Sequence, residues 1–129
     1  MEYASITKED QALIDAATAV IQNNFLRGKH HVGSAVRAKS GKIYAGIHLD
    51  SKNADVCAEQ VAMGMAVSSG EREFDSIVAV QMRDVPKPTV IPPCKTCLEL
   101  IDFYGPDMWV IIERDGELKK GNAKELINE

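Results

Sequence analysis

Three cysteines and one glutamate are the residues of this sequence best suited to chemistry. Glu59 follows Cys57 by two positions, and Cys94 and Cys97 form a C-x-x-C pair directly after Pro93; the 129-residue chain has no other cysteine. Three thiolates can fill three corners of a zinc tetrahedron and leave the fourth for water. A glutamate beside that water, not bound to the metal, can transfer protons. The pattern therefore predicts a zinc site of the hydrolase type.

Each part of this set also has a simpler interpretation. A lone C-x-x-C pair occurs in redox proteins of the thioredoxin type and as half of a zinc finger. The redox interpretation leaves Cys57 and Glu59 unexplained, and the finger interpretation lacks a second ligand pair at matching spacing. Taken singly, Cys57 is a small buried hydrophobic residue, and Glu59 is an acid favoured by the helix dipole in a first turn. The combination favours the metal site.

Local patterns predict the elements that must position these residues. Helices are expected over 58–68 and 94–104, so Cys57 and Cys94 each stand at a helix start, where the dipole lowers the thiol pKa. A further helix begins after Thr7, with an acid three residues on, and a short one spans 123–127. Strands are expected at 32–38, 42–49, 77–80 and 109–113, and a loop at 83–93. This order predicts an α/β sandwich built as one domain, residues 1–129.

Composition narrows the class of protein. The chain is 45% hydrophobic and 26% charged with a net charge of −4, as expected of a soluble globular protein. The acidic balance argues against a nucleic-acid partner, and no apolar run reaches membrane-spanning length. The first residues lack the pattern of a signal peptide. We therefore expect a cytoplasmic location, where thiols stay reduced and favour metal binding.

At these motifs the chain resembles the cytidine deaminase family. The C-A-E tripeptide and the P-C-x-x-C motif match its all-cysteine branch, and residues 32–35 (V-G-S-A) and 41–46 (G-K-I-Y-A-G) are similar to its first two strands. Residues 103–107, 115–116 and 124–127 extend the resemblance over nearly the whole chain. It implies a three-layer α/β/α sandwich with a five-stranded mixed sheet. It also implies a homotetramer, with a homodimer as the alternative.

The resemblance implies a reaction as well. The chain would be a hydrolase acting on C–N bonds of cyclic amidines, which converts the exocyclic amine of a cytosine-type nucleoside to a carbonyl and releases ammonia. The cofactor would be Zn²⁺, held by Cys57, Cys94 and Cys97. Glu59 would shuttle protons, and the Ala58 backbone N–H would hold the ring carbonyl of a small, aminated, pyrimidine-like substrate.

The departures from the family pattern fall on substrate recognition. Nucleoside deaminases carry N-x-E for the ribose hydroxyls where this chain has H-L-D, and His30 stands where an aromatic residue is usual. The loop between the H-L-D segment and the first cysteine is similar in length to that of blasticidin S deaminases, which act on a cytosine nucleoside with an unusual sugar. The candidate substrate-binding residues are Ala58, His48, Asp50 and His30.

A second departure concerns the metal's charge. Gln60 stands where an arginine often follows C-A-E, so the helix dipoles and Lys95 are expected to relieve the excess charge of three thiolates. Two alternatives stay open. One is a deaminase of another aminated heterocycle such as blasticidin S, and the other is a non-catalytic, zinc-stabilised binding protein. Glu59 argues against the second, because a structural zinc site needs no such carboxylate. Structural zinc is also normally closed by a fourth protein ligand.

Overall fold

The strands and helices were obtained from a computed structural model, which describes residues 3–27, 29–82 and 87–129. The helices are α1 (Lys8–Asn24), α2 (Ala58–Ser68), α3 (Lys95–Tyr104) and α4 (Ala123–Ile127). The strands are β1 (Ala4–Ser5), β2 (Val32–Ala38), β3 (Ile43–Ile47), β4 (Leu49–Asp50), β5 (Asp55–Val56), β6 (Phe74–Gln81), β7 (Thr89–Ile91), β8 (Trp109–Arg114) and β9 (Glu117–Asn122).

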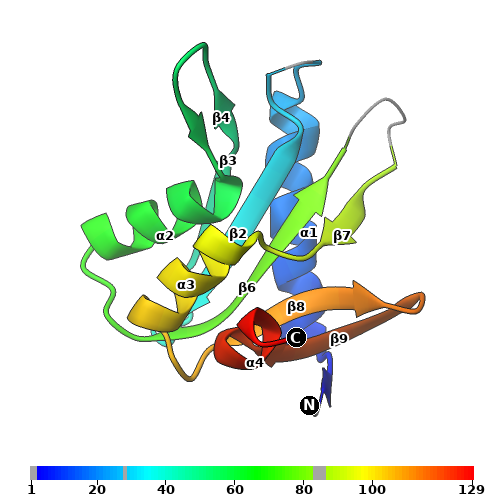
Figure 1. The fold of residues 1–129 in the computed structure, drawn as a ribbon, viewed down its shortest axis with the longest axis vertical. Coiled ribbons are helices and arrows are strands. Elements are labelled where there is room, and N and C mark those ends of the chain that lie inside the picture. The colour runs from blue at the N-terminus through cyan, green and yellow to red at the C-terminus, as the bar shows by residue number, and fades with distance from the viewer. Residues whose placement is uncertain (1–2, 28, 83–86) are drawn as a thin grey trace.

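The sheet is built around β6, whose side chains are almost all buried. The strand order is β1-β9-β8-β6-β2-β3, and β7 also pairs with β6. Only the β6–β8 pairing is parallel among these neighbours, so the sheet is mixed. Helix α1 covers one face, and α2 and α3 cover the other with α4 beside α3 (Figure 1). The predicted three-layer α/β/α sandwich is confirmed.

The sheet has seven strands instead of the five expected. The additions are the two-residue β1 and the three-residue β7, which lies inside the segment predicted to be a loop. Pro88 and Pro92 flank β7, and proline next to so short a run hides the strand from pattern analysis. The remaining expected strands and helices are present, and the bounds of α2, α4 and β2 are those predicted.

Two hydrophobic cores hold the layers together. One lies between the sheet and α1, around Leu13, Ile21 and Val78. The other lies between the sheet and α2, α3 and α4, around Met63, Ile77 and Ile101. Helices α2 and α3 are thereby fixed side by side on one face of the sheet (Figure 1).

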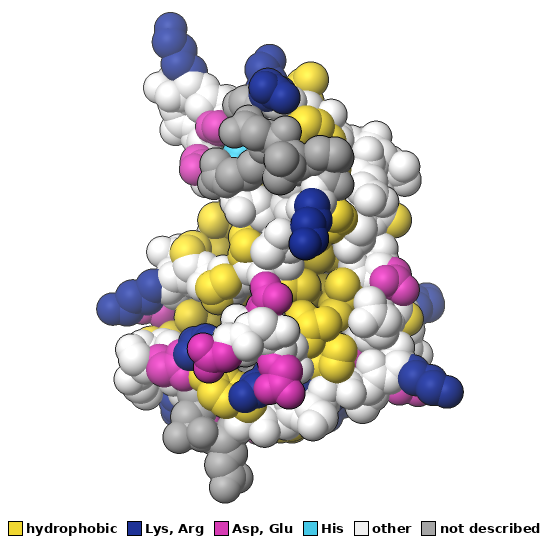
Figure 2. Space-filling model, turned by 90° about the vertical axis from the view of Figure 1, so that its right-hand side faces the viewer, with side chains coloured by type: hydrophobic (Ala, Val, Ile, Leu, Met, Phe, Trp, Pro, Cys, Tyr) yellow, Lys and Arg dark blue, Asp and Glu magenta, His cyan; other side chains and the backbone are white. Residues whose placement is uncertain are grey.

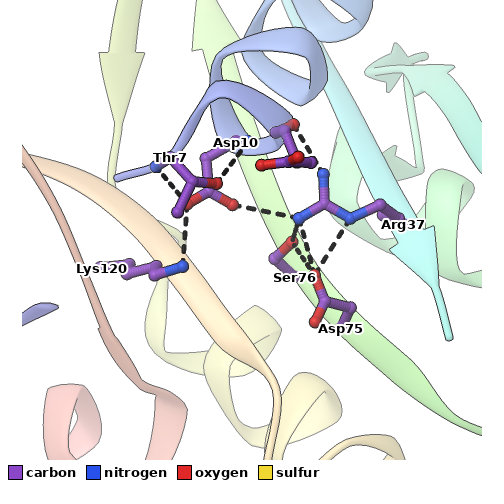
Figure 3. A network of polar contacts seen from close by, with 7 residues as sticks. Thr7, Asp10, Arg37, Asp75, Ser76 and Lys120 are labelled. Atoms are coloured by element: carbon purple, nitrogen blue, oxygen red, sulfur yellow. Dashed lines mark hydrogen bonds and ion pairs between the residues drawn. The ribbon is translucent and has the colours of Figure 1, made fainter. Parts of the chain in front are cut away.

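The start of α1 is anchored by a polar network centred on Asp10. Thr7 and Asp10 form the predicted capping box, with Thr7 Oγ1 accepting from the Asp10 amide at 3.2 Å. The Asp10 carboxylate, fully buried, also pairs with Arg37 at 3.1 Å and with Lys120 at 2.8 Å. Arg37 in turn contacts Asp75 at 2.6 Å (Figure 3). The network joins α1, β2, β6 and β9.

The β8–β9 hairpin turns at Asp115 and Gly116, which have positive φ angles of 54° and 80°.

Acidic and basic side chains lie interspersed on the lower half of the face in Figure 2, and hydrophobic side chains are exposed above them. Within the described part of the chain, no helix combines the length and the hydrophobicity that crossing a membrane requires.

Candidate active site

The three cysteines meet where two helices begin. Cys57 is the N-cap residue of α2 and Cys94 that of α3, and neither side chain caps its own helix. Their sulfurs are therefore free to approach each other, and they lie 3.9 Å apart. Cys97 follows in the first turn of α3, and the three sulfurs all lie within 4.8 Å of one another. The predicted meeting of two helix starts is confirmed.

This cluster fits a zinc ion. Sulfurs about 2.3 Å from a tetrahedral zinc stand about 3.8 Å from each other, close to the observed separation of Cys57 and Cys94. Among the described residues, it is the one group of three histidine, cysteine or acidic side chains whose ligand atoms come together. A set of three thiols is soft and suits zinc. It also leaves one tetrahedral corner without a protein ligand.

Without a cation, the surroundings disfavour thiolates. Burial raises the pKa of Cys57. Burial, followed by the negative charge of Glu59, raises the pKa of Cys97. At Cys57, burial therefore acts against the lowering of the thiol pKa that the helix start led us to expect. A dication among the sulfurs supplies the positive charge that thiolates need.

Glu59 lies deep beside the cluster. It occupies the first turn of α2 and is 4% exposed. Burial raises the pKa of its carboxyl group, while its own backbone N–H and the nearby His48 act in the opposite direction. A buried carboxyl group with a raised pKa exchanges its proton closer to neutral pH than a surface glutamate does.

Gln60 makes a contact with the cluster that the sequence did not predict. Its side-chain nitrogen Nε2 donates to Cys97 Sγ at 3.8 Å. Lys95, expected to relieve the thiolate charge, is exposed at the start of α3. The neutral amide of Gln60 therefore occupies the donor position toward the buried sulfur.

A cavity of about 330 Å³ opens beside Cys57, Cys94 and Glu59. Three of the four predicted substrate-binding residues, His48, Asp50 and Ala58, line it. The complete lining is His31, Val32, His48, Asp50, Asp55, Cys57, Ala58, Glu59, Gln81, Ile91, Pro92 and Cys94.

His30, the fourth predicted substrate-binding residue, does not belong to the lining. Its Nδ1 lies 2.9 Å from the backbone oxygen of His48. His31 takes the place at the cavity, with its ring against that of His48 at 4.9 Å between centroids. Sequence reasoning also missed Asp55, which contacts His48 Nε2 at 2.5 Å. No motif marks Asp55, because it reaches His48, seven residues away, only when β4 and β5 pair.

Comparison with known proteins identifies relatives of the whole chain. The sequence model of a family described as "Cytidine deaminase-like" matches residues 6–93. A blasticidin-S deaminase of Bacillus cereus is 41% identical, over 98% of this chain and 95% of its own length. A probable cytidine deaminase of Dictyostelium discoideum is 28% identical over 93% of this chain and 82% of its own length.

A solved structure supports the same relationship. The cytidine deaminase of Burkholderia pseudomallei superposes with a TM-score of 0.74 at 25% identity, covering 94% of this chain and 96% of the other. The family match includes Cys57 and Glu59 and ends one residue before Cys94, while the B. cereus relative covers both halves of the cysteine cluster. The resemblance seen in the motifs is confirmed, and this chain belongs to the cytidine deaminase-like family.

Proposed function

We propose that the chain is a zinc-dependent hydrolytic deaminase that converts an amine on a cytosine-type nucleoside or nucleoside analogue to a carbonyl and releases ammonia. One observation carries the proposal: three cysteine sulfurs lie within 4.8 Å of one another, and two of these cysteines, Cys57 and Cys94, line a cavity together with the buried Glu59. Cys57, Cys94 and Cys97 would hold the ion. Bound there, zinc would supply Lewis acidity and lower the pKa of water at its open corner.

The residues of the chain then divide the remaining work. Glu59 takes one proton from the attacking water and passes it to the ring nitrogen. It then moves the second proton, from the hydroxyl group added to the ring carbon, to the amine, which leaves as ammonia while the carbonyl forms. Its burial, which raises the pKa of the carboxyl group, suits both directions of transfer. The backbone N–H of Ala58, at the first position of α2, is aimed by the helix start toward an acceptor such as the ring carbonyl.

The matched test is Glu59→Gln, which preserves the size of the side chain. We expect zinc content to be unchanged and ammonia release to fall by roughly 10²–10⁴-fold, the usual contribution of a general acid–base group. Glu113→Gln, an exposed glutamate on β8, serves as the control with full activity. If Glu59→Gln kept its turnover, Glu59 would not be the group that transfers protons in the reaction.

A panel of substrates would choose between nucleosides. Blasticidin S is the second candidate substrate, because a blasticidin-S deaminase is 41% identical over nearly the whole chain. The experiment measures ammonia release by zinc-loaded protein from cytidine, deoxycytidine, cytosine and blasticidin S. The preferred compound shows whether the substrate is an ordinary cytosine nucleoside or blasticidin S. Protein that binds zinc and releases ammonia from none of them would instead support a non-catalytic binding function.

A homotetramer, with a homodimer as the alternative, is the proposed assembly of this single domain of residues 1–129. A groove of about 580 Å³ between α2 and α3 supports it, since apolar side chains such as Met63 and Leu100 line the groove. Phe103, next to it, is 79% exposed. Phe103→Glu should reduce the mass measured by sedimentation.

A cytoplasmic location is also proposed. All three cysteines are free thiols, the form in which a reducing compartment keeps them.

A further inference from the structure

His48 has one satisfied ring nitrogen and one unsatisfied one. It lies between β3 and β4 and is 9% exposed. Its Nε2 lies 2.5 Å from Asp55 Oδ1. Its Nδ1 is buried and has no hydrogen-bond partner. Among the described side chains, it is the one buried nitrogen or oxygen atom in this situation. Such an atom is costly in a folded protein, and no group in the described part of the chain satisfies it, which makes a bound substrate a candidate partner.

The partner of Nε2 decides what Nδ1 can do. An ionised carboxylate only accepts hydrogen bonds, so the proton of the imidazole belongs on Nε2, facing Asp55. In the neutral ring, Nδ1 then carries a lone pair and acts as an acceptor. A carboxylate that sets the tautomer and direction of an imidazole in this way recurs in protein active sites.

The surroundings hold the ring in one orientation. The ring of His31 packs edge-on against it, at an interplanar angle of 76°. His30 contacts its backbone oxygen, which fixes the chain behind the ring. Asp55 comes from β5, which pairs with β4, and His48 directly precedes β4, so this pairing brings the two side chains together. The side chain of Asp55 is 71% exposed, so its contact with His48 is not explained by core packing.

The cavity has two chemically different ends. Cys57, Cys94 and Glu59 lie at the helix starts, where the reacting amine belongs. His48 and Asp55 lie on the ribbon side of the same cavity. A substrate that reacts at the first end therefore presents its remaining part, the sugar or its equivalent, to the second.

We propose that Asp55 is a positioning residue: it fixes His48 so that Nδ1 accepts a hydrogen bond from a hydroxyl or amine of the substrate outside the reacting ring. The inference rests on the deaminase function proposed above. It makes the β4–β5 ribbon the part of the chain that distinguishes a nucleoside from its free base. A substrate without the donor loses binding and keeps its rate of chemistry.

The test uses zinc-loaded Asp55→Asn, which keeps the size of the side chain and adds an amide that can donate to His48. Nitrogen-15 spectra of the His48 ring should show the Nε2–H tautomer in the wild type and a changed tautomer population in the variant. The KM for the best nucleoside of the panel should rise about tenfold, the loss of one hydrogen bond, with kcat within about twofold. The inhibition constant of free cytosine should not change.

Two further variants complete the design. Asp55→Glu keeps a carboxylate and should restore part of the lost KM, and Asp107→Asn, an exposed aspartate outside the cavity lining, controls for the loss of one charge. Unchanged His48 spectra with an unchanged KM would overturn the proposal, as would equal losses for nucleoside and free base. Wild-type protein that releases no ammonia would instead defeat the deaminase function. The dissociation constant of the nucleoside, compared between wild type and Asp55→Asn, would then decide the role of Asp55.

Discussion

At the scale of single residues, the sulfur of Cys97 has an unusual partner for this kind of site. Three thiolates exceed the charge of Zn²⁺ by one, and the family pattern often relieves that excess with an arginine after C-A-E. Here Gln60 donates from a neutral amide at 3.8 Å. It offers a dipole in place of a full charge, so thiolates that hold zinc as proposed would keep more of their negative charge.

Replacing this amide should weaken metal binding. We expect Gln60→Leu to lower the affinity for zinc by roughly tenfold, the lower end of the effect of losing a hydrogen bond to a metal ligand. Competition with a chelator at fixed pH measures the affinity without reference to turnover. Gln11→Leu is the control, because Gln11 lies on α1 and bonds to Asp15. Equal zinc affinity in wild type and Gln60→Leu would show that the contact is without consequence.

Sequence motifs predicted the cysteines and Glu59 because each lies at a fixed offset from a helix start, and local pattern determines such starts. Gln60, His31 and Asp55 could not be placed in the same way. The contact of Gln60 depends on how α2 faces α3, and that of Asp55 depends on the pairing of β4 with β5. Both are tertiary relations, with no periodic signal in the sequence.

At the scale of elements, two glycines allow the helices to lie close to the sheet. A Cβ on Gly33 of β2 would stand 2.6 Å from the backbone oxygen of Ala17 in α1. A Cβ on Gly46 of β3 would stand 2.6 Å from a methyl carbon of Val61 in α2 and 3.1 Å from the backbone nitrogen of Ala62. The G-x-I-Y-x-G resemblance thus has a physical cause at its last glycine, which sets the distance between β3 and the helix that follows Cys57.

Gly46→Ala should therefore affect both stability and the site. Overpacking of this size lowers the free energy of unfolding by about 1–3 kcal/mol. The displaced α2 carries Cys57 and Glu59, so zinc affinity should fall with it. Gly64→Ala in the same helix meets nothing within 4 Å, and it should raise the free energy of unfolding by about 0.5–1 kcal/mol through helix propensity. Urea denaturation measures both, and equal stabilities would contradict the steric argument.

At the scale of the whole molecule, Asp10 connects distant parts of the chain through Arg37 and Lys120 (Figure 3). Burial by itself would raise the pKa of Asp10, yet the hydrogen bonds from Lys120, from the Thr7 backbone and from Arg37 outweigh it and lower the pKa. The folded-state pKa therefore lies below the unfolded value of about 3.9. The stability contributed by this carboxylate is complete above that pH and is lost as the pH falls through the folded-state pKa.

Asp10→Asn should consequently cost about 3 kcal/mol of unfolding free energy at pH 7, because it leaves two cations facing a neutral group. The difference from wild type should shrink below about pH 4, where wild-type Asp10 takes up its proton. Urea denaturation at neutral and acidic pH measures both values. Asp15→Asn, on the exposed side of α1, should show neither effect. A pH-independent difference would rule out the titration of Asp10 as its cause.

The position of the cysteines has a consequence for folding. Cys57 and Cys94 are 37 residues apart in sequence, and the chain between them contains α2, the central strand β6 and the edge strand β7. An ion shared by the two sulfurs would close this stretch into a ring. By analogy with a disulfide, closing a ring of that length lowers the conformational entropy of the unfolded chain, which stabilises the folded state by roughly 4 kcal/mol. Zinc supply would then determine how long the folded chain survives in the cell as well as how fast it turns over substrate.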